Sequence, residues 1–151
     1  MTRVDFYVLP DSSARGRDQF VCRLADIAYR RGQRVYVYAG SPERAADLDT
    51  LLWTFRAGSF IPHARWPSDL AAEAAVLVGH EGVPDQNHEV LINLSDGVPA
   101  FFSRFERVTE VVNQDSAVKQ AGRDKFRYYR DRGYALQTHD MNMAAQKTED
   151  G

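Results

Sequence analysis

The sequence predicts a single-domain α/β protein in which helices flank a mostly parallel sheet. Strand-like runs rich in Val, Ile and Tyr alternate with segments whose apolar residues recur at helical spacing. Strand, helix and strand in that order form a right-handed crossover between parallel strands. The chain has 151 residues, of which 44% are hydrophobic and 26% charged, as expected of one globular domain.

The first strand is predicted over residues 4–9, an apolar run that ends at Pro10. A helix follows, because the next apolar residues recur at helical spacing, and Gly32 just beyond them is a typical helix terminator. The apolar face of this helix consists of Phe20, Val21, Leu24, Ile27 and Ala28.

The second strand is predicted over residues 34–39 and is closed by Gly40. Ser41 and Pro42 then begin a second helix, since a serine hydroxyl caps free amides and proline is favoured at the first helical position. This helix extends to about Trp53 and places Ala45, Leu48 and Leu52 on one face.

The second half of the chain contains further strands and one long helix. The helix is predicted over residues 115–132 and ends at Gly133, a residue suited to the left-handed turn at a helix end. Residues 1–140 are expected to form the domain, and the tail over residues 141–151, with few large apolar groups, is expected to be flexible. The strands are predicted over residues 76–79, 90–94, 107–112 and 134–138.

Charge is distributed unevenly along the chain. Residues 115–132 hold six basic and three acidic residues, a balance of +3, whereas the other 133 residues hold 13 basic and 18 acidic ones, a balance of −5. General nucleic-acid binders display a broad basic face, so one basic helix on an acidic body favours a small acidic ligand. No apolar run is long enough to cross a bilayer and no signal peptide is recognisable, so the expected location is the cytoplasm.

No catalytic residue, metal site or cofactor is predicted. The turn over residues 10–16 holds one glycine where a dinucleotide fingerprint needs several, and no phosphate loop occurs. The His-Glu pairs at residues 80–81 and 88–89 lie in polar loops outside any helical zinc motif, so we expect solvated side chains there. Cys22 is the only cysteine and lies on an apolar helix face, where a buried, unreactive thiol is expected.

Basic side chains gather on one face of the late helix. Acidic residues are almost absent from this face, and like charges at such spacing destabilise a helix, so a binding role is favoured over plain solvation. The ligand would offer acidic groups to the guanidinium groups and an apolar group to the ring at the border of the face. In order around an arc of about 100°, the residues are Phe126, Lys119, Arg130, Arg123 and Arg127.

Residues 51–63 place three large aromatic side chains, Trp53, Phe55 and Phe60, in a segment that leaves a helix. Loops usually lie on the protein surface, so the rings either fold back over the core or leave apolar area uncovered. Uncovered rings next to Arg56 would fit a protein–protein hot spot, where Trp and Arg are enriched. The sequence alone leaves both readings open.

Segments spread through most of the chain resemble the chi subunit family of bacterial DNA polymerase III. The Trp…Ser-Phe-x-Pro-His and Tyr-Arg-x-x-Gly-Tyr patterns are fairly specific in combination. The matching segments are Val4-Asp5-Phe6-Tyr7, Leu52-Trp53-Thr54-Phe55, Ser59-Phe60-Ile61-Pro62-His63, Leu91-Ile92-Asn93-Leu94, Phe105-Glu106-Arg107-Val108 and Tyr128-Tyr129-Arg130-Asp131-Arg132-Gly133-Tyr134.

The resemblance implies a Rossmann-like fold that has lost its nucleotide ligand. It also implies a non-catalytic accessory subunit of the clamp-loader assembly in DNA replication. Chi proteins pair with the small psi subunit and grip the acidic C-terminal tail of single-stranded DNA-binding protein, which ends in Pro-Phe. Contact with DNA would then be mainly indirect, and in some chi proteins a helicase shares the psi surface.

Carried over by position, the tail site would be Lys119, Arg123, Phe126 and Arg127, with Val112 nearby. The psi-binding residues would be Trp53, Arg56 and Phe60. Some relatives have tyrosine in place of Phe126 and proline in place of Arg56, which makes Arg56 the least secure assignment. Two alternatives remain: a nucleotide-dependent α/β enzyme, and a protein that binds single-stranded DNA directly through the late helix.

Overall fold

The structure is a computed structural model that describes residues 1–56, 60–69 and 71–141. Three α-helices are present in these ranges: α1 (Ala14–Arg30), α2 (Pro42–Thr54) and α3 (Ser116–Asp131). Two short 3-10 helices, η1 (Ala71–Glu73) and η2 (Phe102–Arg104), lie in the connections. The strands are β1 (Arg3–Val8), β2 (Val35–Tyr38), β3 (His63–Arg65), β4 (Val76–Gly79), β5 (Val90–Asn93), β6 (Arg107–Val112) and β7 (Ala135–Asp140).

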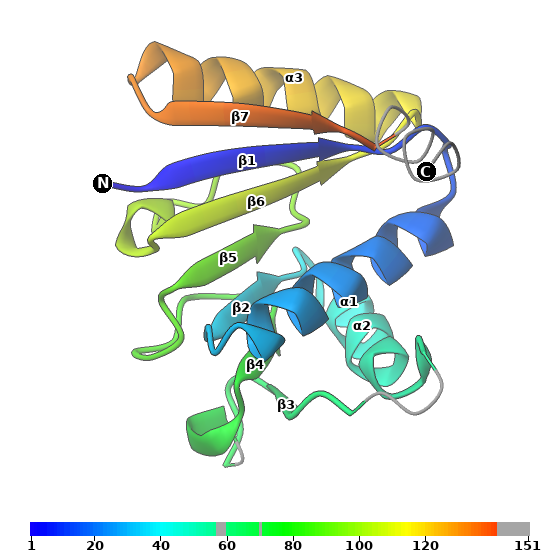
Figure 1. Ribbon diagram of the computed structural model, residues 1–151, viewed down its shortest axis with the longest axis vertical. Helices are drawn as coiled ribbons and strands as arrows, with labels where there is room; N and C mark the ends of the chain where they lie inside the picture. Colours follow the sequence, from blue (N-terminus) through cyan, green and yellow to red (C-terminus); the bar gives the residue numbers. More distant parts are fainter. Residues whose placement is uncertain (57–59, 70, 142–151) are drawn as a thin grey trace.

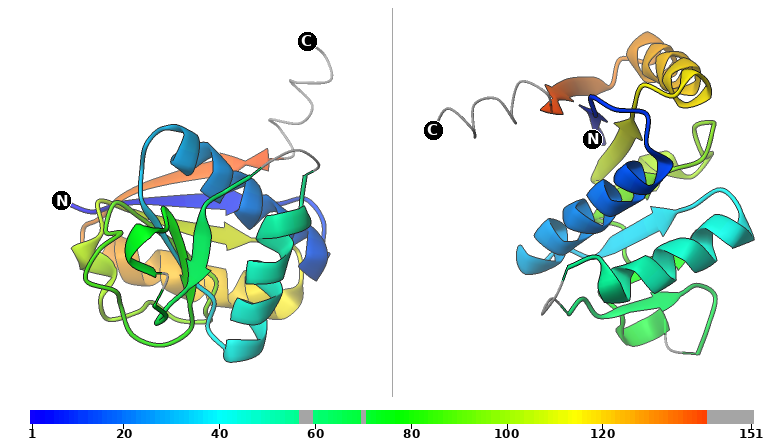
Figure 2. Two further views of the ribbon diagram at one scale, coloured as in Figure 1. Left: turned by 90° about the horizontal axis from the view of Figure 1, so that it is seen from below. Right: turned by 90° about the vertical axis from the view of Figure 1, so that its right-hand side faces the viewer.

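All seven strands belong to one sheet, in the order β3-β4-β2-β5-β6-β1-β7. Every neighbouring pair is parallel, which confirms the predicted fold class. Helices α1 and α2 cover one face of the sheet and α3 covers the other (Figure 1 and Figure 2). Strand β1 lies between β6 and β7, so its neighbours come from the far end of the sequence.

Ser41 begins a helix and Gly133 follows one as predicted, and Ser13, which was not predicted as a cap, begins α1. The hydroxyl of Ser13 accepts a hydrogen bond from the Gly16 amide at the start of α1, and the hydroxyl of Ser41 accepts one from the Arg44 amide at the start of α2. Gly133, after α3, has φ of 80°, the left-handed conformation that glycine adopts without strain.

Two sequence predictions about strands need correction. Strand β3 was not predicted, because three residues that include His63 and Arg65 are too few to show an apolar pattern. Arg34 precedes β2 and is not part of it. Its guanidinium Nε donates to Asn87 Oδ1 at 2.8 Å and its Nη2 to the Ala74 carbonyl at 3.1 Å, so it fixes the loops beside the N-terminal end of β2.

The sheet divides the core into two clusters. Val4 and Phe6 of β1 point to the α3 side, whereas Tyr7 and Leu9 point to the α1 and α2 side, as the alternation of a strand requires. Strands β4 and β5 are buried along their whole length, as in parallel sheets covered on both faces. Within the described residues, no helix combines the length and the apolar character needed to cross a membrane.

Candidate functional site

A buried polar network fixes α3 to the sheet. The carboxylate of Glu110 on β6 accepts hydrogen bonds from Lys125 Nζ at 2.7 Å, from the Tyr129 hydroxyl at 2.8 Å and from Asn93 Nδ2 at 2.8 Å. Lys125 Nζ also donates to the carbonyl oxygen of Ser95 at 2.9 Å. Burial and the adjacent Glu110 carboxylate raise the pKa of Tyr129, so its hydroxyl stays protonated and remains a donor. These bonds set the rotation of the helix.

Gly122 lets α3 approach the sheet closely. A Cβ atom at this position would lie 2.7 Å from Val112 Cγ2, which is closer than carbon atoms pack. Gly122 therefore faces the sheet. The close approach brings the basic face of α3 to the border of the sheet.

An apolar groove of about 210 Å³ lies between α3 and the ends of β1, β6 and β7. Its floor includes Phe6, Val8 and Val112, and Phe126 closes one wall. The Phe6 and Phe126 rings meet edge to face with centroids 5.3 Å apart. The remaining lining residues are Lys119, Gly122, Arg123 and Thr138.

Two cations border this groove. Lys119 Nζ donates to Gln114 Oε1 at 3.2 Å, and the side chain of Arg123 makes no ion pair with any described residue. Arg127 lies outside the groove lining, further along the helix. Two other cations of α3 already have acidic partners. Arg127 forms an ion pair with Asp124 at 3.9 Å, and Arg130 forms one with Asp131 at 3.1 Å. Lys119 and Arg123 are therefore the cations most available to a ligand in the groove.

Four of the five predicted tail-site residues line the groove together: Lys119, Arg123, Phe126 and Val112. Sequence reasoning missed Phe6, Val8 and Thr138. The alternation along residues 4–9 places Phe6 and Val8 on one face of a strand. The sequence does not show that this strand lies beside the late helix, because that depends on the strand order.

The aromatic segment divides between the core and the surface. Phe55 packs against the core cluster on the α1 and α2 side, whereas 56% of Trp53 and 64% of Phe60 are exposed. The Trp53 and Phe60 rings lie 5.9 Å apart, and Trp53 also contacts His63 at 4.5 Å. We call Trp53 and Phe60 the aromatic pair. The reading in which all three rings cover the core is therefore wrong.

Arg56 lies close to the aromatic pair in sequence and is mostly exposed. Its Nη1 is 3.8 Å from Asp26 Oδ2, a long and partly solvated ion pair that leaves most of the guanidinium accessible. The ring of His63 packs against the ring of Trp53. The nitrogens of His63 lie 2.7 Å from the Ile61 carbonyl and 3.1 Å from the Asp49 carbonyl, which holds the imidazole in place. The next residues, 57–59, lie outside the described part of the chain.

The groove and the aromatic pair lie at opposite ends of the sheet. Helix α3 packs against β6 and β7, whereas α2, which carries Trp53, packs against β3 and β4. The two helices also lie on opposite faces of the sheet (Figure 2). A ligand in the groove leaves the aromatic pair uncovered.

The two His-Glu pairs differ in their surroundings. Glu81 is exposed, but the ring of His88 packs 5.3 Å from Phe105 and its Nε2 lies 2.6 Å from the Pro84 carbonyl. Glu89 accepts a hydrogen bond from the Arg34 amide at 3.0 Å. The expectation of solvated side chains is therefore wrong for His80, whose Nδ1 is buried, and for His88 and Glu89, which hold their loop in place. Among the residues that the structure describes, no group of three or more His, Cys, Asp or Glu side chains could hold a metal ion.

Comparison with solved structures defines the class of fold. The chain superimposes on one from the crystal structure of T4 UvsW with a TM-score of 0.62 and 10% sequence identity, over 92% of this chain and 42% of that one. This likeness shows a shared α/β fold and carries no information about activity.

The family is shown by sequence. A family model described as DNA polymerase III chi subunit, HolC, matches residues 1–137. The chain is 45% identical over 141 residues to DNA polymerase III subunit chi of Pseudomonas aeruginosa, covering 93% of this chain and 98% of that protein. The subunit of the same name from Escherichia coli is 29% identical over 143 residues, covering 91% and 97%. The chain belongs to the DNA polymerase III chi subunit family, a family of DNA replication subunits.

Proposed function

We propose that this chain is a non-catalytic accessory subunit of the DNA polymerase III clamp-loader assembly. It bridges the psi subunit to the acidic C-terminal tail of single-stranded DNA-binding protein. The observation that carries the proposal is the apolar groove beside α3 with Lys119 and Arg123 at its border. A groove of this kind suits a chain end that combines an aromatic ring with negative charge.

The tail has matching chemistry. Its terminal phenylalanine ring would enter the groove beside Phe126, and its terminal carboxylate would accept charge-assisted hydrogen bonds from Arg123 or Lys119. The aspartates upstream would be attracted by Arg127, which lies outside the groove on the same helix. A short peptide loses conformational freedom on binding, so we expect a micromolar dissociation constant, about −8 kcal/mol.

Replacement of Arg123 tests the tail site. Arg123→Ala should weaken binding of a fluorescent tail peptide by about 1.5–3 kcal/mol, since it removes charge-assisted hydrogen bonds. Fluorescence anisotropy measures the dissociation constant. Binding of the parent protein should also weaken as salt rises, because exposed charges are screened over about 10 Å at 0.1 M salt.

Arg23→Ala is a matched control for this experiment. Arg23 is exposed on α1, on the opposite face of the sheet, and its guanidinium lies over the Phe20 ring at 5.8 Å. Arg34 also lies away from α3, but its replacement would be a poor control, because its guanidinium donates a hydrogen bond to Asn87 and holds that loop in place. A peptide without its terminal Phe should lose a similar amount of affinity to the Arg123 variant. Equal affinity of the parent and the Arg123→Ala protein, with the fold intact, would remove the tail site from α3.

The aromatic pair is the proposed psi-binding surface, together with Arg56. Exposed aromatic rings next to an arginine are typical of interface anchors. Trp53→Ala or Phe60→Ala should weaken psi binding by roughly 2 kcal/mol or more, as measured by calorimetry with purified psi, or by co-purification from cell extract where psi is unidentified. Tail-peptide binding should persist in both variants.

Both rings are more than half exposed, so these variants should keep the fold. Circular dichroism of each variant checks this expectation. A folded variant that binds psi normally would remove the psi site from the aromatic pair. If a helicase binds the same surface as psi, its binding should be lost in the same variants. The proposed place of the complex is the replisome, in the cytoplasm.

The two alternatives are tested directly. A nucleotide-dependent enzyme should give a calorimetric signal with ATP, GTP or NAD, whereas the proposed adaptor gives none. A direct DNA binder should retain bare single-stranded DNA without the partner's tail, and Arg123→Ala should weaken that binding as well.

A further inference from the structure

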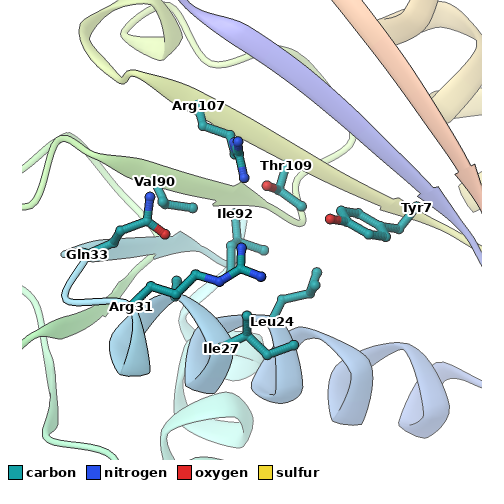
Figure 3. Close-up of a pocket in the computed structure, with 10 residues that line it drawn as sticks. Tyr7, Leu24, Ile27, Arg31, Gln33, Val90, Ile92, Arg107 and Thr109 are labelled. Atoms are coloured by element: carbon teal, nitrogen blue, oxygen red, sulfur yellow. The ribbon is translucent and has the colours of Figure 1, made fainter.

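A second cavity lies on the other face of the sheet from the groove, between the end of α1 and the beginnings of β5 and β6 (Figure 3). It has a volume of about 50 Å³. Cavities need about 10–15 Å³ to hold one water molecule, so this one accommodates a group about as large as four oxygen atoms. Its apolar wall consists of Leu24, Ile27, Ala28, Val90 and Ile92.

Hydrogen-bond donors converge on this space from three elements. The guanidinium groups of Arg31, at the end of α1, and Arg107, at the start of β6, point toward each other across it (Figure 3). The hydroxyls of Thr109 and Tyr7 point into the same space from β6 and β1 (Figure 3). Gln33 adds an amide at the border.

Three of these donors, the side chains of Thr109, Tyr7 and Arg31, lack hydrogen-bond partners within the described part of the chain. Thr109 is only 4% exposed, yet its hydroxyl makes no hydrogen bond to a described residue. The same holds for the Tyr7 hydroxyl and the Arg31 guanidinium across residues 1–56, 60–69 and 71–141. The Thr109 oxygen keeps some accessible surface within the cavity, so it is available to a ligand or to water.

The charges around the cavity favour an anion. Asp5 is the nearest carboxylate to Arg107, but its two oxygens are occupied by Arg107 Nε at 3.3 Å and His139 Nε2 at 3.1 Å, and it is outside the cavity lining. The carbonyls of Ile27, Ala28 and Tyr29 accept hydrogen bonds from the amides of residues 31–33, so the charged group that this end of α1 presents to the cavity is the Arg31 guanidinium. Burial raises the pKa of Tyr7, which keeps its hydroxyl a donor.

We propose that this cavity binds one phosphate-type oxyanion. Two guanidinium groups and two hydroxyls supply the charge-assisted hydrogen bonds that a tetrahedral oxyanion accepts, and the volume fits its four oxygens. Free phosphate and a backbone phosphate of single-stranded DNA present the same chemistry. The site is separate from the groove and does not depend on the tail.

Titration of the full chain with inorganic phosphate, at constant ionic strength, tests the proposal. Amide resonances of residues 7, 31, 107 and 109 should shift and saturate together. Arg31→Gln should weaken phosphate binding about tenfold or more, since it removes charge-assisted hydrogen bonds, and Thr109→Val about threefold to tenfold, since it removes a neutral one. Arg31 is exposed, so its variant should keep the fold even if the Thr109 variant does not.

Arg23→Gln is the control, because it makes the same charge change on α1 outside the cavity. It should leave phosphate affinity nearly unchanged. A second arm adds an oligodeoxythymidine: displacement of phosphate identifies nucleic-acid phosphate as the ligand, and no displacement identifies free phosphate. Shifts that do not saturate, or equal weakening by Arg31→Gln and Arg23→Gln, would overturn the site. Tail-peptide affinity should be the same in the parent and Arg31→Gln, which separates this result from that of the groove.

Discussion

Cys22 illustrates how burial controls chemistry at a single residue. It is fully buried in α1, as its place on the apolar helix face predicts, and burial together with Asp18 raises the pKa of its thiol to about 12. Thiolate is the reactive form, and a rise from 9 to about 12 lowers its fraction about a thousandfold below pH 9.

The thiol should therefore resist alkylation in the folded protein. Iodoacetamide at pH 8 should modify Cys22 far more slowly in native protein than in protein unfolded by guanidinium. Mass spectrometry of timed samples measures both rates. Similar rates in the two states would show that α1 opens readily around Cys22.

Other single residues show where sequence reasoning stops. The helical spacing separates Lys125 from the basic face, and Lys125 is indeed buried in the structure. Its partner Glu110 was not predicted, because an acidic residue inside a strand carries no sign of its partner until the strand and helix are packed. Thr109 was not predicted as a binding residue for the same reason, since the cavity that it lines forms only when α1, β5 and β6 pack together.

At the scale of one element, α3 depends on the Lys125–Glu110 pair. Lys125→Met should destabilise the protein by about 3–5 kcal/mol, because it leaves the Glu110 carboxylate buried without a cation. Urea unfolding followed by circular dichroism measures the loss. Tail-peptide affinity should fall as well, since the network sets the rotation of the helix.

A double variant separates charge from packing in this prediction. Lys125→Met combined with Glu110→Gln has no unpaired charge, so it should recover a large part of the lost stability. The Gln side chain also keeps an acceptor for the Tyr129 hydroxyl, 2.8 Å from Glu110 Oε2 in the parent protein. If the double variant is less stable than Lys125→Met, the buried charge is not the cause of the loss.

Most elements were predictable because each has a strong local pattern. Helix α2 begins at Ser41 and Pro42, Gly32 and Gly133 follow α1 and α3, and the short central strands β2, β4 and β5 consist mainly of apolar residues. Strand β3 has no such pattern, and it forms because β4 offers it a partner edge. Local chemistry therefore predicts elements that stabilise themselves, and it misses those that depend on a neighbour.

At the scale of the whole molecule, the groove and the aromatic pair should act independently. They lie at opposite ends of the sheet, and the proposed binding at one requires no rearrangement at the other. Coupling between two sites requires that a ligand at one site changes the state of the protein that the other ligand binds. The tail peptide should therefore bind the complex with psi and the free chain with the same affinity, within about 0.5 kcal/mol.

Calorimetric titration of the peptide into the free chain and into its complex with psi checks this expectation. The double variant Arg123→Ala with Trp53→Ala should show the summed losses of the single variants. A large change in peptide affinity on adding psi would reveal a conformational link across the sheet.

The strand order is the part of the fold that the sequence hides. Parallel pairing follows from the alternation of strands and helices, but nothing in residues 4–9 shows that β1 lies between β6 and β7. That placement brings Phe6 to the groove and Tyr7 to the second cavity. The cations of α3 were recognisable from their spacing, whereas Phe6 and Val8 on β1 were not.

The position of β1 also affects the order in which the sheet forms during translation. Its partners start at Arg107 and Ala135, so at about 5–20 residues per second the first strand waits several seconds or more for them to be made. Strands β2, β4 and β5 can pair earlier, since they need only the first two-thirds of the chain. The groove forms last, because it requires β1, α3 and β7 together. A nascent chain whose strand β7 has not yet been made therefore has no groove with which to capture a partner.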